Sequence, residues 1–285
     1  MNTKIQIRFT LGKLLAVAAG CLAFQSAQAS LLFSEGFNYP AGAGVGGNVN
    51  PGSGVAWTGN SNVTVDGTDP VLTYSGLNNI SVNNMKVVWG VSSGTVKNDP
   101  AFSTVSSGQV YYSFLLDMTA LPSSTGSGTY LTALNAAGAN PNGSSDAVDI
   151  YINNSGVMTM KSKGVSASAN TTLSLDTTYL VVLEYDFGAN LSSIYVNPDS
   201  STFGAASAPA AFATATPAVG AITGLGDLGF KAQTSSTSGT FLVDNILVGT
   251  TWADVTPAAV PEPSTIALAG LGLLGLAARC RRARQ

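Results

Sequence analysis

The side chains with the clearest chemical potential in this sequence are two carboxylates, Glu184 and Asp186, which stand two residues apart. That spacing puts both groups on one face of a β-strand, and a pair of carboxylates is what hydrolysis of a glycosidic bond requires. The chain contains no histidine, which excludes Ser-His-Asp and Cys-His catalytic sets and His-based zinc sites. An enzyme built on this sequence would therefore act through carboxylates, lysines or hydroxyl groups.

Other carboxylates supply oxygen atoms of the kind that calcium binds. The run from Asp66 to Asp69 is a plausible fragment of a calcium loop, and Asp146 and Asp149 add further oxygens. No complete D-x-[DN]-x-[DN]-G loop is present, and hydrogen bonds within Asx turns explain the same residues equally well. Calcium therefore stays an open alternative, and the sequence predicts no other cofactor.

Three tryptophans, Trp57, Trp89 and Trp252, are candidates for contact with a sugar ring. Glycan sites combine aromatic platforms with nearby polar groups, and Tyr74 and Tyr195 extend this set. The alternative is that the rings pack in the core or at a sheet edge. The surrounding segments favour that alternative for Trp57 and Trp252.

Hydrophobic patterns with a period of two predict the elements that carry these side chains. Residues 179–187 place their odd-numbered members inward and leave Glu184 and Asp186 on an outer face, which we expect to be solvated. Residues 111–118 and 147–152 alternate in the same way. Six shorter strand candidates complete the set: 71–74, 86–89, 157–161, 193–196, 228–232 and 241–248.

No part of the middle region shows a long helical period. Turn sequences rich in Asn, Gly and Ser separate the strands, and the low-complexity stretches 41–54 and 204–217 are expected to be surface loops. About a dozen short strands in roughly 230 residues are typical of one sandwich domain. The predicted fold class is all-β, a two-sheet antiparallel sandwich over residues 30–256.

The N-terminal residues 1–29 have the organisation of a secretory signal peptide. Basic residues precede an apolar run over residues 14–24, and Ala27 and Ala29 then supply the small-x-small cleavage pattern before Ser30. The run is too short to persist as a transmembrane helix, which needs roughly 20 apolar residues. The general secretion machinery is therefore an expected partner.

The C-terminal residues 257–285 form a second targeting segment. The motif at 260–264 contains Pro261, Glu262 and Pro263, and an apolar helix is predicted over residues 264–278. A basic stop follows it, made of Arg279, Arg281, Arg282 and Arg284. The positive-inside rule keeps such a stop in the cytoplasm, which predicts that the helix enters the inner membrane. The alternative of a buried terminal helix would leave its basic end without an acidic partner.

The charge of the body differs from that of the whole chain. Residues 30–260 carry 14 acidic side chains against five lysines, a net charge near −9, which argues against a nucleic-acid partner. Both cysteines, Cys21 and Cys280, lie in the end segments, so the mature body is free of thiols. Lipoprotein processing at Cys21 is a less supported alternative to signal-peptide cleavage.

The segment 260–285 closely resembles the PEP-CTERM sorting signal of Gram-negative bacteria, in its P-E-P tripeptide, glycine-rich apolar helix and terminal arginines. The resemblance implies an exosortase, a membrane protease, as processing partner. It also implies transient anchoring in the inner membrane and final delivery to the outer surface or to an extracellular polymeric matrix.

The body resembles the concanavalin A-like (laminin G-like) jelly-roll domains. The resemblance rests on segments such as 32–39, 110–114, 179–182 and 243–246, and on the ending 248–255. It implies a sandwich whose last strand pairs near the first, but it does not decide function, since the fold carries lectins, glucanases and adhesive modules.

Glucanases of that fold present a third carboxylate after such a pair, where this chain has Gly188 or Ala189. We therefore predict an exported, non-enzymatic module with a structural role or an extracellular polysaccharide as partner. The alternative is a polysaccharide-active enzyme, a hydrolase or lyase, that uses Glu184 and Asp186.

Overall fold

The computed structural model of the chain describes residues 31–59, 63–90, 94–98, 101–126, 128–139, 147–217, 220–232 and 238–259. The predicted signal peptide, with Ala27, Ala29 and Ser30, lies outside these residues, and so does the segment from 260 onward with Pro261 to Pro263 and the arginines. Within the described ranges, no helix has the length and apolar character needed to cross a membrane.

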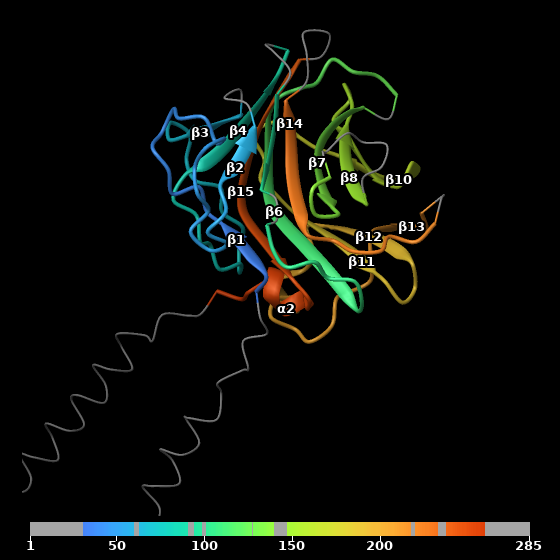
Figure 1. The fold of residues 1–285 in the computed structure, drawn as a ribbon. Coiled ribbons are helices and arrows are strands. Elements are labelled where there is room, and N and C mark those ends of the chain that lie inside the picture. The colour runs from blue at the N-terminus through green and yellow to red at the C-terminus, as the bar shows by residue number, and fades with distance from the viewer. Residues whose placement is uncertain are drawn as a thin grey trace, which may run out of the picture.

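The described residues form fifteen strands in two antiparallel sheets that face each other as a sandwich (Figure 1). Sheet 1 has the order β13-β12-β11-β6-β15-β4-β3, and β1 pairs with β15 off this path. Its strands are β1 (Phe33–Glu35), β3 (Val63–Asp66), β4 (Asn84–Trp89), β6 (Gln109–Ala120), β11 (Tyr179–Asp186), β12 (Leu191–Val196), β13 (Ala213–Ala215) and β15 (Gly239–Gly249).

Sheet 2 has the order β10-β9-β8-β7-β14-β5-β2. Its strands are β2 (Trp57–Gly59), β5 (Gly94–Asn98), β7 (Thr129–Asn135), β8 (Val148–Ile152), β9 (Val157–Ser162), β10 (Val165–Thr172) and β14 (Asp227–Ala232). Two short helices complete the described elements, the 3₁₀ helix η1 (Ser200–Thr202) and α2 (Trp252–Val255). The two-sheet antiparallel sandwich predicted from the sequence is confirmed.

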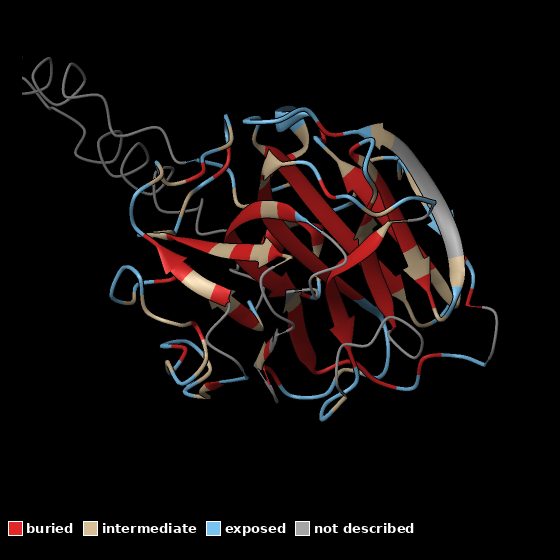
Figure 2. Ribbon diagram, turned by 90° about the horizontal axis from the view of Figure 1, so that it is seen from above, coloured by how far each residue is buried: buried red, intermediate tan, exposed pale blue. Residues whose placement is uncertain are grey.

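Side chains that alternate along the strands fill the space between the sheets. Most strand residues are accordingly coloured as buried in Figure 2. On β11, Val181, Leu183 and Tyr185 point into this core, as the period-two pattern predicts. On β8 of the opposite sheet, Ile150 and Ile152 do the same and are fully buried. The inward faces of the two sheets therefore make one continuous apolar core.

The outer face of sheet 1 is buried as well, because chain segments lie across it. Leu115, Leu180 and Val182 point outward from this sheet and pack in a second apolar cluster with Phe203 and Trp252 from the covering segments. The prediction of a solvated outer face on β11 is therefore wrong. Segments around 72–77, 203–211 and 252–255 exclude water from it.

Two local predictions also need correction. Residues 71–74 form no strand, because side-chain amides take the place of a strand partner: Leu72 N–H donates to Asn84 Oδ1 (3.1 Å), and Asn79 Nδ2 donates to Leu72 O (2.7 Å). The stretch 204–217, predicted as a loop, contains β13, which pairs with β12 at the edge of sheet 1.

The two ends of the described chain meet at β15. Strand β1 pairs with it in the register Glu35↔Ile246, which confirms the predicted pairing of the last strand with the first. Helix α2 follows β15, and beyond it Asn78 N–H donates to Pro257 O (2.8 Å) and Ala259 N–H to Gly76 O (2.9 Å). β1 and α2 lie at the same end of the sandwich (Figure 1). The chain is thus held by backbone hydrogen bonds up to Ala259.

Candidate functional site

Glu184 lies on the outer face of β11 between two tyrosines from its neighbouring strands. Tyr111 on β6 pairs with it in register and donates its hydroxyl to Glu184 Oε1 (3.1 Å). Tyr195 on β12 donates to Glu184 Oε2 (2.6 Å). The carboxylate is only 6% exposed, so these two charge-assisted hydrogen bonds compensate for its loss of water.

The electrostatics of the site keep both hydroxyls protonated. Burial, together with the adjacent Glu184 carboxylate, raises the pKa of Tyr111 and of Tyr195 well above that of a free phenol. Each tyrosine is therefore a hydrogen-bond donor over the whole physiological pH range. The site combines a fixed acceptor with two fixed donors.

Trp252 forms the wall beside these tyrosines. Its ring centre lies 5.0 Å from that of Tyr195 and 6.2 Å from that of Tyr111, and its indole N–H donates to Thr202 O (2.9 Å). The ring is held at the first residue of α2, where Thr251 and Asp254 form a reciprocal capping box. The start of this short helix thus fixes the buried Trp252 ring beside the two tyrosines that hold Glu184.

These residues border a pocket of about 350 Å³. Its other lining residues are small or polar: Gln109, Ala206, Ser207, Ala208, Pro209, Thr250 and Thr251. Neither a lysine nor an arginine is among the residues that line it, and Glu184 is its one charged residue. The pocket is therefore lined by hydroxyl, amide and carboxylate groups.

A second hollow of about 420 Å³ adjoins the first, because Tyr195 and Pro209 line both. Phe212 is 53% exposed at its edge, and Asp199 is the charged residue of its lining. The two hollows together follow β12 along the outer face of sheet 1. They give the site room for a ligand longer than a single ring.

Asp186, the second carboxylate of the sequence motif, does not line either hollow. Its Oδ1 accepts hydrogen bonds from the backbone amides of Gly188 (2.8 Å) and Ala189 (2.9 Å), which closes the turn after β11. The amide of Ala189 lowers the pKa of Asp186. Gln109 Nε2 donates to Asp186 Oδ2 (3.2 Å), and its Oε1 lies 3.2 Å from the Tyr111 hydroxyl, whose single proton is shared with Glu184 Oε1.

The three tryptophans predicted as glycan contacts do not lie together. Trp57 is fully buried against Phe33 and Phe37 and donates its indole N–H to Glu35 Oε2 (2.9 Å). Trp89 is 2% exposed, with its ring centre 4.4 Å from that of Phe241. Both rings are part of the inter-sheet core and present no surface to a ligand. Trp252 is 1% exposed, so it too is buried, although it is the one tryptophan of the three that lines the pocket.

The predicted calcium ligands are likewise dispersed. Lys86 Nζ lies 3.5 Å from Asp66 Oδ1 and 3.2 Å from Asp69 Oδ2 on sheet 1, so an ammonium occupies the space between these carboxylates. Asp149 belongs to β8 of sheet 2, and Asp146 lies outside the described residues. Across the described ranges, no three acidic, histidine or cysteine side chains gather in a way that would hold a metal ion.

Tyr111, Gln109 and Ser207 were missed by the sequence reasoning. A signal for Tyr111 was present, since the alternation that places Tyr112 inward places Tyr111 on the same outer face as Glu184. Ser207 had no comparable signal. It lies in a low-complexity stretch whose course over sheet 1 depends on tertiary packing.

Residues 259–282 match the PEP-CTERM protein-sorting motif family. The match confirms the prediction for the C-terminal segment and covers the tail rather than the folded domain. The motif implies export, processing by an exosortase and transient anchoring in the membrane. No curated protein matches the chain.

Several solved structures are similar to the folded domain at low sequence identity. The cellulose-induced protein Cip1 is 15% identical over 68% of this chain and 86% of its own, with a TM-score of 0.43. A protein of unknown function from Shewanella oneidensis is 12% identical over 90% of this chain and 100% of its own, with a TM-score of 0.45. The binding domain of botulinum neurotoxin DC, in complex with SialylT, is 10% identical over 72% of this chain and 44% of its own, with a TM-score of 0.45.

Proposed function

We propose that this chain is a surface or extracellular-matrix protein of a Gram-negative bacterium, whose sandwich binds a glycan without cleaving it. The sorting motif supports delivery through the inner membrane by an exosortase-type system. The pocket around Glu184 supports glycan binding. The two parts of the proposal are independent and have separate tests.

The position of the sorting motif supports processing close to the folded domain. Backbone hydrogen bonds hold the chain as far as Ala259, and Pro261 follows after a single residue. The five residue steps from Ala259 to Ser264, where the apolar segment begins, span at most about 18 Å at full extension. The processing enzyme would therefore act directly beside the sandwich.

Deletion of residues 261–285 tests the sorting part. We expect the shortened protein to lose its membrane-bound form and to appear in the soluble exported fraction, because the apolar segment and basic stop are gone. Cell fractionation with an antibody against the sandwich measures this. An unchanged distribution between fractions would contradict the sorting function and leave the glycan proposal unaffected.

The observation that carries the glycan proposal is the Glu184 carboxylate in the wall of a pocket that adjoins a second hollow, where the Phe212 ring is exposed. A sugar presents an apolar ring face and several hydroxyl groups, which require an aromatic surface and fixed hydrogen-bond partners at the same place. The exposed ring of Phe212 supplies the first, and Glu184 with Tyr111 and Tyr195 supplies the second. Both hollows lie in the size range of small-molecule sites, about 300–1,000 Å³.

The charge of the site limits the glycan class. The residues that line the two hollows include Glu184 and Asp199 but no lysine or arginine. The carboxylate of an acidic sugar would be repelled by these carboxylates, because no cation compensates for the like charges. A neutral sugar or a protonated amino sugar would meet no such repulsion. We therefore propose a neutral or amino-sugar polymer as the ligand.

Binding without cleavage is supported by the state of the two carboxylates. A glycoside hydrolase needs one carboxyl group that stays protonated to donate to the leaving oxygen. Asp186 has a lowered pKa and serves a turn, and both oxygens of Glu184 accept tyrosine hydrogen bonds. Incubation with glucans, followed by an assay for reducing ends, tests this: turnover that disappears in Glu184→Gln would establish the enzyme instead.

A glycan array with neutral and amino-sugar oligosaccharides tests the binding site. We expect Tyr195→Phe to weaken binding about tenfold, because it removes the hydroxyl that fixes Glu184 and keeps the ring. The matched control is Tyr74→Phe, which alters a tyrosine of the same outer cluster that does not line the pocket. Equal affinities of the two variants, or no binding by the natural protein, would contradict the proposal.

A further inference from the structure

The lysines of the body are concentrated on sheet 2. Lys97 lies on β5, Lys161 on β9, Lys231 on β14, and Lys163 in the turn between β9 and β10. The fifth lysine of the body, Lys86, lies on sheet 1 and is neutralised by Asp66 and Asp69. In a body of net charge near −9, four of the five cations therefore belong to one side of the sandwich.

Strand alternation directs three of these lysines away from the core. Their neighbours Val96, Met160 and Phe230 are fully buried between the sheets. Because successive side chains of a strand point to opposite faces, Lys97, Lys161 and Lys231 point outward. All three are half-buried, with ammonium groups on stems that lie along the sheet.

Two tyrosines join Lys161 and Lys231 in one row across four adjacent strands. Lys161 Nζ on β9 lies 3.6 Å from the centre of the Tyr151 ring on β8. The Tyr151 and Tyr130 rings, the latter on β7, meet edge to face at 5.7 Å. Lys231 Nζ on β14 lies 6.0 Å from the centre of the Tyr130 ring. We name these four residues the lysine–tyrosine row.

Next to the lysine–tyrosine row, small residues and two carboxylates lie on the same outer face of sheet 2. Asp149 lies between Lys161 and Ala133 in register, and Gly229 lies between Ala133 and Lys97. Asp227 Oδ2 is 3.8 Å from Lys97 Nζ, so that cation has a partner within the protein. Lys161 and Lys231 make no ion pair with any described residue. Lys163 Nζ, in the turn, donates to Ala221 O (3.1 Å). Lys161 and Lys231 are therefore the strand lysines of this face that can serve a ligand.

We propose that the lysine–tyrosine row binds an acidic polysaccharide through its carboxylate groups. Lys161 and Lys231 would pair with carboxylates of the polymer, and the exposed part of Tyr151 would contact a sugar ring between them. This site is distinct from the Glu184 pocket and does not depend on the function proposed for it.

The spacing of the cations favours a polymer over a small anion. Neighbouring strands lie about 4.8 Å apart, so three strand steps separate β9 from β14 by about 14 Å. A chain with an acid on successive sugars can place a carboxylate beside each of two lysines on strands so spaced.

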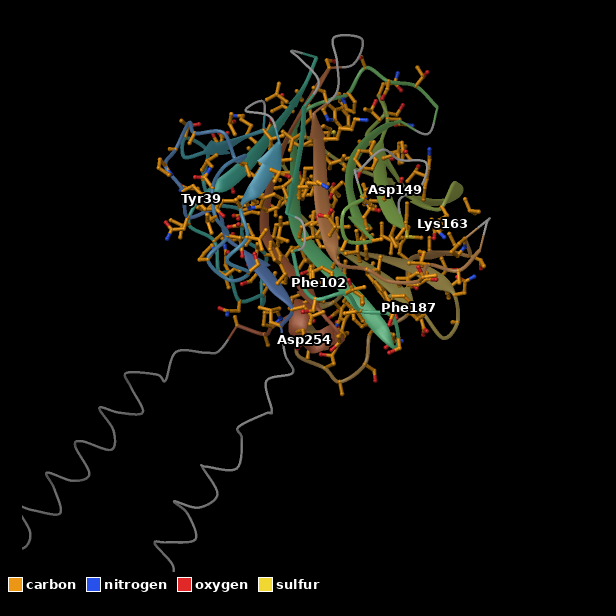
Figure 3. The ribbon with its side chains drawn as sticks, viewed as in Figure 1. Tyr39, Phe102, Asp149, Lys163, Phe187 and Asp254 are labelled. Carbon is orange, nitrogen blue, oxygen red and sulfur yellow. The ribbon has the colours of Figure 1, made fainter. Side chains whose placement is uncertain are left out.

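The two proposed sites lie on opposite outer faces of the sandwich. The Glu184 pocket is on sheet 1 beside α2, and the lysine–tyrosine row is on sheet 2. Figure 3 shows Asp149 and Lys163 on the β8–β10 side of the molecule, apart from Asp254 of α2. One molecule could therefore hold an acidic polymer on one face while the other face binds a neutral or amino-sugar polymer.

Affinity electrophoresis of the full exported protein in gels that contain polygalacturonate tests the proposal. We expect retardation by polygalacturonate that 0.5 M salt abolishes, and none by fully methyl-esterified polygalacturonate, which has the same chain without the charge. Lys161→Gln combined with Lys231→Gln should reduce the affinity about tenfold. Circular dichroism would establish that the variants are folded.

The control variant is Lys86→Gln, which removes a cation from sheet 1, and we expect it to keep at least half of the natural affinity. Equal losses from Lys86→Gln and Lys161→Gln would show an effect of net charge alone and would overturn the proposal. So would absence of retardation, or tighter binding of single-stranded DNA than of polygalacturonate. Glu184→Gln should leave retardation unchanged, which separates this site from the glycan pocket.

Discussion

The two outer faces of this sandwich start from the same strand geometry and end in opposite chemistry. On sheet 1, covering segments bury the face and leave Glu184 at the wall of a pocket without cations. On sheet 2, Lys161 and Lys231 stay half-exposed beside two tyrosines. The strand pattern decides which residues point outward, and the chain that lies over a face decides whether they become core or surface.

The charged residues are also distributed unevenly between the two sheets. Carboxylates of the described residues gather on the outer side of sheet 1 and its cover, among them Asp66, Asp117, Glu184 and Asp244. The lysines gather on sheet 2. An average charge near −9 therefore hides a domain with two different sides.

The largest expected effect comes from truncating an aromatic residue on each face. Trp252→Ala should lower the free energy of unfolding by about 3–5 kcal/mol, because the ring is 1% exposed and packs against Tyr111 and Tyr195. Tyr151→Ala on sheet 2 should cost about 1 kcal/mol, since its ring is half-exposed. Urea unfolding measures both. Equal losses would mean that the two faces are equally covered.

A smaller and pH-dependent effect is expected at Asp244, which lies fully buried on β15 with Oδ2 unpartnered among the described residues. Burial raises its pKa to about 7, from an ordinary value of about 3.9. The folded state then binds the proton more tightly than the unfolded state. The contribution of protonated Asp244 to the free energy of unfolding is therefore fully present below pH 4. It is lost as the pH rises to about 7, and the loss is at most about 4 kcal/mol.

Asp244→Asn should remove that loss, so its gain in melting temperature should be larger at pH 8 than at pH 5. Asp186→Asn is the matched control, because the pKa of Asp186 is lowered and its effect on stability has the opposite pH dependence. The ionised Asp186 carboxylate stabilises the fold at neutral pH, and this stabilisation disappears as the pH falls below 4. A gain for Asp244→Asn that is the same at both pH values would contradict the burial of an ionisable group on this face.

The smallest expected effect compares the charged residues used in the binding experiments. Glu184→Gln should lower the free energy of unfolding by about 1–2 kcal/mol, because two buried tyrosine hydroxyls lose a charged acceptor. Lys161→Gln should change it by less than about 1 kcal/mol, since its contact is a cation–π interaction on a half-exposed side chain. Thermal unfolding measures both losses. A larger loss for Lys161→Gln than for Glu184→Gln would contradict the assignment of the buried charged residue to sheet 1.

Much of the sandwich was predictable because local alternation is strong in the central strands. The inward set of β11 and the outward position of Glu184 followed from the strand pattern. The pairing of β15 with β1 followed from the resemblance to concanavalin A-like domains. The sorting motif was predictable because its three parts are contiguous in the chain.

The cover of sheet 1 was not predictable in this way. The sequence around Leu72 predicts a strand, but the side-chain amides of Asn79 and Asn84 hold this segment by hydrogen bonds instead. Residues 203–211 have no periodic pattern, yet they pack over β11 and β12 and line the pocket. Such contacts join parts of the chain far apart in sequence. The burial of Trp57 could not be predicted for the same reason. As a tryptophan it is a candidate glycan contact, but it is a core residue whose indole N–H donates to Glu35.

The most direct measurement of the two-faced account is a crossed binding experiment on the full exported protein. Titrations would use an amino-sugar or neutral oligosaccharide selected on the array and, separately, polygalacturonate, with Glu184→Gln and with Lys161→Gln. The account predicts that Glu184→Gln loses only the first ligand and Lys161→Gln weakens only the second. Parallel loss of both ligands in either variant would contradict it, because the two faces would then form one site.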